Sequence, residues 1–528
     1  MSLKKLKQIQ DNLLHTHKKL FLVNITQSTP IHIIFLTIFP IIFIFSENMK
    51  ELVPADVLIP LLIILPISLT IFFILKLILK DSKKAALIVS IGLVLFFTYG
   101  HFYNILKGFT ILDEVIGRHR YLIIPFILGI IIPIYFIIKS KIDFQNITKI
   151  VNGISIVLVI MVFVNVTTFG MTEIESYSTI NYETTHEPME LQNIYNTPDV
   201  YYIILDEYGG PESMKYLNYD NSQFYEFLKG KKFIIPEKPT GNYPISQFSI
   251  ASSLNMEYLN DLSNIVGKNL KSYLPVIEML YNNPVMKNFK SLGYEIVIFD
   301  SEFVPAKNFV LVDDIKCHKD EMNSILLGSI TRVSMIGYFV ERVDEEKRRD
   351  QIKCAFSEVK TIGNNKDKPI FAFIHILLPH PPNIFGPNGE SVIPGNSISS
   401  EIWDEKIAYI DQLKFANTEI TKVIEKILDK NEKSIIILQS DHGSGLDVDF
   451  KNPDESMMLQ RLSILNAYYA PEISENRFHE NITPVNSFRI IFNDYFNGSY
   501  KILEDRNYWN TGDAPWDFHD VTKIIGNK

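Results

Sequence analysis

Hydrophobic residues divide the chain into two parts with different patterns. Between residues 30 and 170 the sequence is mostly Ile, Leu, Phe and Val, with few charges. A helix needs roughly 20 apolar residues to cross a bilayer. Five stretches approach that length: 30–46, 57–75, 86–106, 121–138 and 150–169. The pattern predicts an N-terminal membrane domain of five helices over residues 30–170.

Lysines predict how this domain is oriented. They gather before the first predicted span, in the second loop and in the fourth loop: Lys4, Lys5, Lys7, Lys18 and Lys19, then Lys76, Lys80, Lys83 and Lys84, then Lys139, Lys141 and Lys149. Positively charged short loops stay on the cytoplasmic side. We therefore expect residues 1–29 to be cytoplasmic and, after five spans, the rest of the chain to lie outside. The predicted location is the inner or plasma membrane, with several passes.

After residue 170 the pattern changes to that of a water-soluble domain. Residues 171–197 are polar and acidic, which is typical of a linker, and a domain is expected over 198–528. Five continuous apolar runs follow, beginning at PDVYYIILDEYGG and including 294–302, 369–380, 434–443 and 462–471. Runs of this kind are typical of strands covered on both faces, and helical patterns such as 409–430 lie between them. The alternation predicts an α/β domain with a largely parallel central sheet and helices on both sides.

Charge and cysteine content exclude some functions. The net charge of −9 provides no basic field for nucleic acid. The two cysteines, Cys317 and Cys354, form no CxxC motif, which excludes a thiolate metal site. A single bridge between them stays open if the domain lies in an oxidising compartment.

Acidic and histidine residues stand where the predicted strands end. Asp206 and Glu207 follow the first strand, His380 follows the third, and Asp441 and His442 follow the fourth in the motif SDHG. The carboxyl ends of parallel strands meet at one sheet edge, and carboxylate and imidazole ligands suit zinc or manganese. We predict a site for one divalent metal there.

Two alternatives affect the ligand set. A shift of one residue in the first strand would make Glu207 the ligand in place of Asp206. His375 lies inside the third strand, where a structural role is favoured over metal binding.

A hydroxyl-rich segment supplies candidate nucleophiles. SQFSIASSLNMEYL, residues 246–259, has the apolar spacing of a helix, and Ser246 stands at its start. Free backbone N–H groups there favour an alkoxide or a substrate anion, although Ser246 could be an N-cap alone. Thr240, Ser249 and Ser252 are competitors. Arg461 and Arg489 could clamp a phosphate or form surface ion pairs.

The motifs LDEYG, NYPISQFSIASSLN, HILLPHPP and SDHG, in this order, resemble the alkaline phosphatase/sulfatase superfamily. The resemblance is strongest to its membrane-anchored branch, which includes lipoteichoic acid synthases and lipid A phosphoethanolamine transferases. It implies metal ligation by Asp206, Ser246, Asp441 and His442, with Ser246 as nucleophile. It also implies substrate binding by Ser249 and His380, with His380 contacting the phosphate. The formylglycine motif of true sulfatases is absent from the sequence.

The resemblance implies a metal-dependent phosphotransferase that moves a group such as phosphoglycerol or phosphoethanolamine. The donor would be a membrane lipid, the acceptor an envelope glycan or lipid, and the intermediate a phospho-serine. One alternative is a sulfatase-like hydrolase of phosphodiesters or sulfate esters. Another is a non-catalytic envelope protein that binds glycan or acts as a scaffold.

Overall fold

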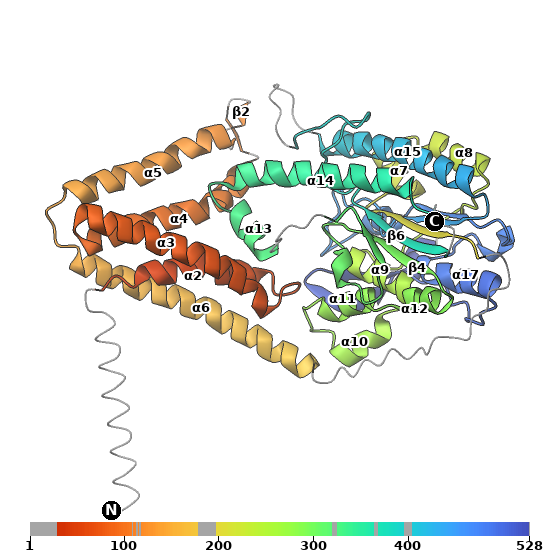
Figure 1. Ribbon diagram of the computed structural model, residues 1–528, viewed down its shortest axis with the longest axis horizontal. Coiled ribbons are helices and arrows are strands. Elements are labelled where there is room, and N and C mark those ends of the chain that lie inside the picture. The colour runs from red at the N-terminus through yellow and green to blue at the C-terminus, as the bar shows by residue number, and fades with distance from the viewer. Residues whose placement is uncertain are drawn as a thin grey trace, which may run out of the picture. The chain divides into compact units, whose positions relative to one another are not determined.

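The computed structural model describes residues 29–177 except 108, 112–113 and 116–117, and then 197–318, 325–363, 368–394 and 404–526. The chain forms two compact units (Figure 1). One comprises Met1–Thr172 and Glu321–Val343, and the other comprises Glu173–Asp320 and Asp344–Lys528. The lysines predicted to precede the first span, and most of the predicted linker 171–197, lie outside the described residues.

The first unit contains the predicted apolar helices. Four helical segments are long and apolar enough to cross a membrane within the described residues: Pro54–Leu79, Ser82–Leu106, His119–Lys139 and Gln145–Gly170. In the structure they correspond to η1 (Pro54–Val57) with α3 (Leu58–Leu79), α4 (Ser82–Leu106), α5 (His119–Lys139) and α6 (Gln145–Tyr177). The first predicted span forms a shorter helix of 16 residues, α2 (His32–Glu47). The N-terminal domain of apolar helices is thus confirmed. Four of the five predicted spans are long enough to cross a membrane, and the first is shorter. Two paired strands of two residues each, β1 (Thr110–Ile111) and β2 (Glu114–Val115), precede α5.

A segment distant in sequence joins this unit. Helix α13 (Ile325–Arg332) packs against α2, burying Leu326 and Ile330 in one cluster with Ile41, Ile44 and Phe45. Further along, the backbone N–H of Gly100 donates to the carbonyl of Val333 at 2.8 Å. Residues Leu326 and Ile330 therefore form part of the core of the helical unit.

A six-stranded sheet forms the centre of the second unit. Its order is β5-β4-β6-β3-β7-β8, and the strands are β3 (Val200–Leu205), β4 (Glu295–Phe299), β5 (Asp314–Lys316), β6 (Ile370–Ile376), β7 (Ile435–Gln439) and β8 (Asn466–Tyr469). All neighbours are parallel except β7 and β8. The largely parallel sheet is confirmed. The short edge strand β5, which has no apolar run, was missed.

Helices cover both faces of the sheet, as predicted (Figure 1). One face buries apolar residues of α9 (Ser246–Asn255), α10 (Asn260–Val266), α11 (Leu274–Tyr281), α12 (Pro284–Ser291) and α17 (Ser487–Phe496). The other buries residues of α7 (Pro211–Leu217), α8 (Ser222–Gly230), α14 (Gly337–Val359) and α15 (Glu405–Lys430). Short elements complete the fold: η2 (Ala306–Asn308), α16 (Glu455–Leu462), η3 (Glu475–Arg477), η4 (Pro484–Asn486) and α18 (Thr522–Gly526). Apolar residues therefore cover both faces of the sheet.

The C-terminal segment and the two cysteines close the domain. A hairpin of β9 (Tyr508–Thr511) and β10 (Ala514–Asp520) places Trp516, which is fully buried, against Phe248. Cys317 and Cys354 form a disulfide that joins the chain after β5 to α14. The disulfide bridge that the sequence left open is therefore present in the structure.

Candidate active site

Strand alternation brings three polar side chains to one face of the sheet edge. Successive residues of a strand point to opposite faces. Asp206 continues the alternation of Tyr202 and Ile204, which pack on the side where α9 lies. His375 lies two and four residues after Phe373 and Phe371 in β6, so it points to the same face, where those residues pack. Asp441 likewise follows Ile435 and Ile437 by an even number of residues, so all three approach α9.

Asp206 and His375 face each other in the interior. Their register follows from the pairing of β3 with β6, in which Ile204 lies opposite His375. His375 Nε2 is 3.2 Å from Asp206 Oδ2, and both side chains are at most 1% exposed. On the other side of the ring, Nδ1 lies 3.4 Å from the hydroxyl of Ser301, which follows β4. His375 therefore presents Nε2 to the cluster.

Asp441 and His442 reach the same point from β7. His442 Nε2 is 3.1 Å from Asp441 Oδ2 and 3.9 Å from Asp206 Oδ1. The other oxygen of Asp441 accepts the backbone N–H groups of Glu207 and His442 at 3.0 and 2.9 Å. The predicted ligands Asp206, Asp441 and His442 thus come together.

Gly443 is needed for close packing in this turn. A Cβ atom there would collide with the carbonyl oxygens of Gln460 and Ser463. The backbone approach of α16, more than a sharp turn, explains the glycine of SDHG.

Burial and mutual charge shift the pKa values of the cluster. Burial and the nearby charge of Asp206 raise the pKa of Asp441 to about 6. Burial tends to raise the pKa of Asp206, but His380 and His375 outweigh it and hold that pKa well below its usual range. Burial and the Arg461 charge lower the pKa of His442. At neutral pH the imidazole of His442 is therefore a neutral electron-pair donor.

Ser246 is the first residue of α9, and its hydroxyl meets the cluster. Ser246 Oγ lies 2.9 Å from His442 Nε2. The competing hydroxyls bond elsewhere: Thr240 with the amide of Asn507, Ser249 with the carbonyl of Asp441, and Ser252 with the carbonyl of Glu257. Of the four, Ser246 is the one whose hydroxyl contacts the Asp–His cluster through a side chain. The bond from Ser249 positions Asp441, and its substrate role stays a prediction.

His380 is the exposed member of the site. Its side chain is 38% exposed, and Nε2 lies 3.6 Å from Glu207 Oε2. Gln412 of α15 donates to the carbonyls of Pro379 and His380 at 3.0 and 3.2 Å, which fixes the loop. Burial tends to lower the pKa of His380, but Asp206 and Glu207 outweigh it and raise that pKa above 6.5. His380 can therefore carry a proton near neutral pH.

The donor set fits a divalent cation. Ligand atoms of Asp206, Glu207 and His442 lie within 4.8 Å of one another, and so do those of Asp206, His375 and Asp441. Asp206 Oδ1, Asp441 Oδ2 and His375 Nε2 are buried without a hydrogen bond to any described residue. Buried polar atoms are normally paired, and carboxylate with imidazole suits zinc or manganese. A cation at this place would satisfy them.

Three residues extend the predicted site. His375, favoured as structural from the sequence, has the geometry of a ligand. Glu207 adopts a left-handed backbone, with φ of 62°, and lies near His380 and Arg461, so both acidic residues of LDEYG reach the site. Arg461 lies 3.0 Å from His442. Glu207 follows the end of β3 directly, as the alternative ligand named from the sequence, whereas sheet order places His375 and helix placement brings Arg461 to the site.

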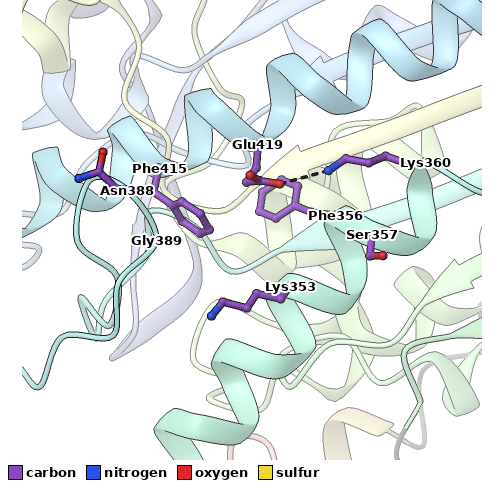
Figure 2. Close-up of a pocket in the computed structure, with 8 residues that line it drawn as sticks. All are labelled: Lys353, Phe356, Ser357, Lys360, Asn388, Gly389, Phe415 and Glu419. Atoms are coloured by element: carbon purple, nitrogen blue, oxygen red, sulfur yellow. Dashed lines mark hydrogen bonds and ion pairs between the residues drawn. The ribbon is translucent and has the colours of Figure 1, made fainter.

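A separate cavity of about 300 Å³ lies between α14 and α15 (Figure 2). Its lining is Lys353, Phe356, Ser357, Lys360, Asn388, Gly389, Phe415 and Glu419. It shares no residue with the cluster, and its charges include a Lys360–Glu419 ion pair at 3.2 Å. The carboxylate–imidazole cluster, and not this cavity, has the groups for catalysis.

Comparison with known proteins agrees with the resemblance in part. The sulfatase family model matches residues 330–486, which include HILLPHPP and SDHG. No curated protein sequence matches the chain.

Three solved structures illustrate the similar folds. The C-terminal periplasmic domain of EcEptC from Escherichia coli, in complex with Zn, is 12% identical, with a TM-score of 0.42, and covers 65% of this chain and 99% of that one. Lipooligosaccharide phosphoethanolamine transferase A from Neisseria meningitidis, an integral membrane protein, is 12% identical, with a TM-score of 0.38. The match covers 80% of this chain and 84% of that one. A protein of Bacteroides thetaiotaomicron that is assigned as a sulfatase is 11% identical, with a TM-score of 0.38, and the match covers 60% of this chain and 78% of that one.

At these identities and scores the likenesses establish no shared reaction. The sulfatase match stands on the sequence itself, and the family it describes consists of enzymes. It confirms the resemblance of the soluble domain to the alkaline phosphatase/sulfatase superfamily, and with it the prediction of an enzyme.

Proposed function

We propose that this enzyme transfers a phosphate-containing group from a membrane lipid to an envelope glycan or lipid through a phospho-serine at Ser246. One observation carries the proposal: the hydroxyl at the start of α9 lies 2.9 Å from His442 Nε2, inside a buried carboxylate–imidazole cluster. A hydroxyl needs such an environment to react as an alkoxide. The helix start adds backbone N–H groups and a positive dipole end.

Asp206, Asp441 and His442 would hold the metal, with His375 and Glu207 close enough to complete the set. A bound zinc or manganese ion supplies a Lewis acid that lowers the pKa of a nearby hydroxyl and neutralises phosphate charge. The buried atoms Asp206 Oδ1 and Asp441 Oδ2 accept no hydrogen bond from any described residue, which supports this assignment.

The residues of the chain then take part in two successive displacements at phosphorus. Ser246 reacts as the alkoxide: its Oγ bonds to phosphorus as the bond from phosphorus to the donor oxygen breaks. His380, whose raised pKa lets it carry a proton, protonates that leaving oxygen. An acceptor hydroxyl then gives its proton to His380 and attacks phosphorus, and the Ser246–phosphorus bond breaks.

The apolar helices and the disulfide support the location of the reaction. Among the described residues, four helices could cross a membrane, and they would bring the site to a lipid donor. The Cys317–Cys354 disulfide is typical of an oxidising compartment. We therefore place the α/β domain outside the cytoplasm, at the inner or plasma membrane.

The test uses the full chain in vesicles that contain phospholipids labelled in the head group, with candidate envelope acceptors and either zinc or manganese. We expect label on Ser246 as phospho-serine, seen by mass spectrometry, and then on the acceptor. Ser246→Ala should lower turnover by on the order of 10³ or more, since removing a nucleophile removes the covalent route.

Ser252→Ala is the matched control, because Ser252 lies in the same helix but bonds to the Glu257 carbonyl. It should retain activity. Label that reaches water alone, even with acceptors present, would assign hydrolysis instead of transfer. Normal turnover by Ser246→Ala would move the nucleophile elsewhere.

A further inference from the structure

Arg461 of α16 reaches into the cluster from outside the predicted ligand set. Its side chain is 9% exposed, and its Nη2 lies 3.0 Å from His442 Nε2. Two backbone carbonyls fix the rest of the guanidinium: Nε donates to Pro244 at 2.9 Å and Nη1 to Gly443 at 3.1 Å. The Phe450 ring lies beneath it, with 5.0 Å from Cζ to the centroid. Arg461 is therefore held in place, with Nη2 directed at the reacting groups.

The anchors of Arg461 tie it to both halves of the site. Pro244 comes two residues before Ser246, and Gly443 comes directly after His442. A guanidinium held by the backbone on both sides needs no rearrangement to receive a ligand. Preorganised donors of this kind stabilise charge in an active site more than mobile ones do.

His442 Nε2 has more polar neighbours than a single nitrogen atom can bond. Ser246 Oγ, Arg461 Nη2 and Asp441 Oδ2 lie at 2.9, 3.0 and 3.1 Å from this one nitrogen. A neutral imidazole nitrogen offers one lone pair. When a cation takes that pair, Nη2 of Arg461 is left as a charged donor beside the nucleophile.

The charges of the site favour a second cation of this kind. Asp206, Glu207 and Asp441 place three carboxyl groups in one buried region. One divalent cation compensates two of these charges, which leaves one for Arg461 and for the proton carried by His380, and a phosphodiester would add another. Arg461, with Nη1 3.6 Å from Glu207 Oε1, balances the site before the substrate arrives.

We propose that Arg461 is a further substrate-binding residue, whose Nη2 binds a non-bridging oxygen of the tetrahedral oxyanion at Ser246. Guanidinium groups match the geometry and charge of phosphate oxygens. Arg489 differs: it donates to the carbonyls of Met256 and Lys501 and serves the fold. The inference rests on the proposed function for the role of Ser246.

The test measures anion binding apart from turnover. Full-length wild type, Arg461→Gln and Arg461→Lys, each loaded with zinc, are titrated with inorganic phosphate by calorimetry, and their metal content is measured. We expect every variant to retain the metal. Phosphate affinity should fall about 10- to 100-fold in Arg461→Gln, as for loss of a charged hydrogen bond, and recover in part in Arg461→Lys.

Arg477→Gln is the control, because Arg477 pairs with Asp494 at the surface, and it should bind phosphate like wild type. Unchanged phosphate affinity in a metal-loaded Arg461→Gln would overturn the proposal. So would loss of the metal from Arg461→Lys, since Arg461 would then serve the cation site. Phosphate binding that depends on Arg461, without transfer of lipid label, would contradict the proposed function and leave this inference standing.

Discussion

Aspartate and histidine meet in two different settings in the α/β domain. At the sheet edge, Asp206 faces His375, and one oxygen of the carboxylate has no hydrogen bond among the described residues. Near the surface, Asp505 faces His479. There the carboxylate also accepts three bonds at 2.8–3.1 Å, from the N–H and hydroxyl of Thr483 and the amide of Asn486.

The difference shows that proximity of Asp and His does not define a metal site. The Asp505 carboxylate is satisfied by protein donors, and the His479 side chain is 45% exposed to water. The buried cluster has fewer donors than lone pairs, and an unpaired buried charge is strongly unfavourable. Such a cluster needs a ligand, whereas the surface pair needs none.

The largest expected effect comes from removing the buried pair at the end of β7. Asp441→Ala with His442→Ala should abolish metal binding and lower turnover by on the order of 10³ or more, because the cation and the alkoxide lose their support. Elemental analysis of the purified full-length protein and the lipid-label assay would measure both.

The matched control changes the surface pair: Asp505→Asn with His479→Gln. We expect this variant to keep its metal, and any effect to appear as a loss of thermal stability, since Asp505 orders the chain around Thr483. If both double variants kept the metal, the buried cluster would not be the metal site. If both lost it, burial would not separate the two settings.

The next largest effect is expected at His380, which faces Glu207 at the exposed side of the cluster. His380→Gln should lower turnover by about 10²-fold, the usual contribution of a general acid, while metal content stays unchanged. His318→Gln is the control, because His318 pairs with Asp300 at a distance of 2.9 Å and belongs to neither group of possible metal ligands. Equal turnover in the two variants would remove the proton-transfer role of His380.

A smaller effect is expected from pH on metal affinity. The pKa of Asp441, raised to about 6 by burial and by Asp206, means that the metal-free carboxyl takes up a proton below that pH. Metal binding must displace this proton. The titration of Asp441 should therefore change the metal affinity little between pH 8 and 6.5. Below pH 6 the metal affinity should fall by about tenfold per pH unit.

Calorimetric titration of zinc into the metal-free protein would measure this dependence. Asp441→Asn should bind more weakly at pH 7.5, and its affinity should lose the part of the pH slope due to Asp441. A wild-type affinity that stays level between pH 6 and 5 would contradict the assignment of Asp441 as a ligand that must be deprotonated.

Sequence patterns predicted the layers of the fold because the layers follow from the local alternation of apolar strands and amphipathic helices along the chain. The apolar runs of β3, β6 and β7 are buried on both faces, and such runs read directly as central strands. β5, with the sequence DIK, has no such pattern and pairs only through its position beside β4. Strand ends likewise indicated Asp206, Asp441 and His442.

What could not be predicted depends on order and register. His375 becomes a ligand candidate because β6 lies next to β3, with Ile204 opposite it. Arg461 enters because α16 packs its backbone on Gly443. Neither contact leaves a local signal, since strand order and helix docking are set by packing over the whole domain.

The smallest effect on the site is expected from the disulfide. Cys317 precedes His318, whose partner Asp300 follows β4, so the bridge secures the satisfied Asp300–His318 pair to α14. Replacing both Cys317 and Cys354 by Ser should lower the free energy of unfolding by about 4 kcal/mol, as for loops of this length. Metal content and turnover should stay within about twofold of wild type, because no ligand lies in the bridged segment between the cysteines. Denaturant unfolding beside metal analysis would measure both. A metal lost together with the disulfide would show that the buried cluster depends on the bridge and on the Asp300–His318 pair beside it.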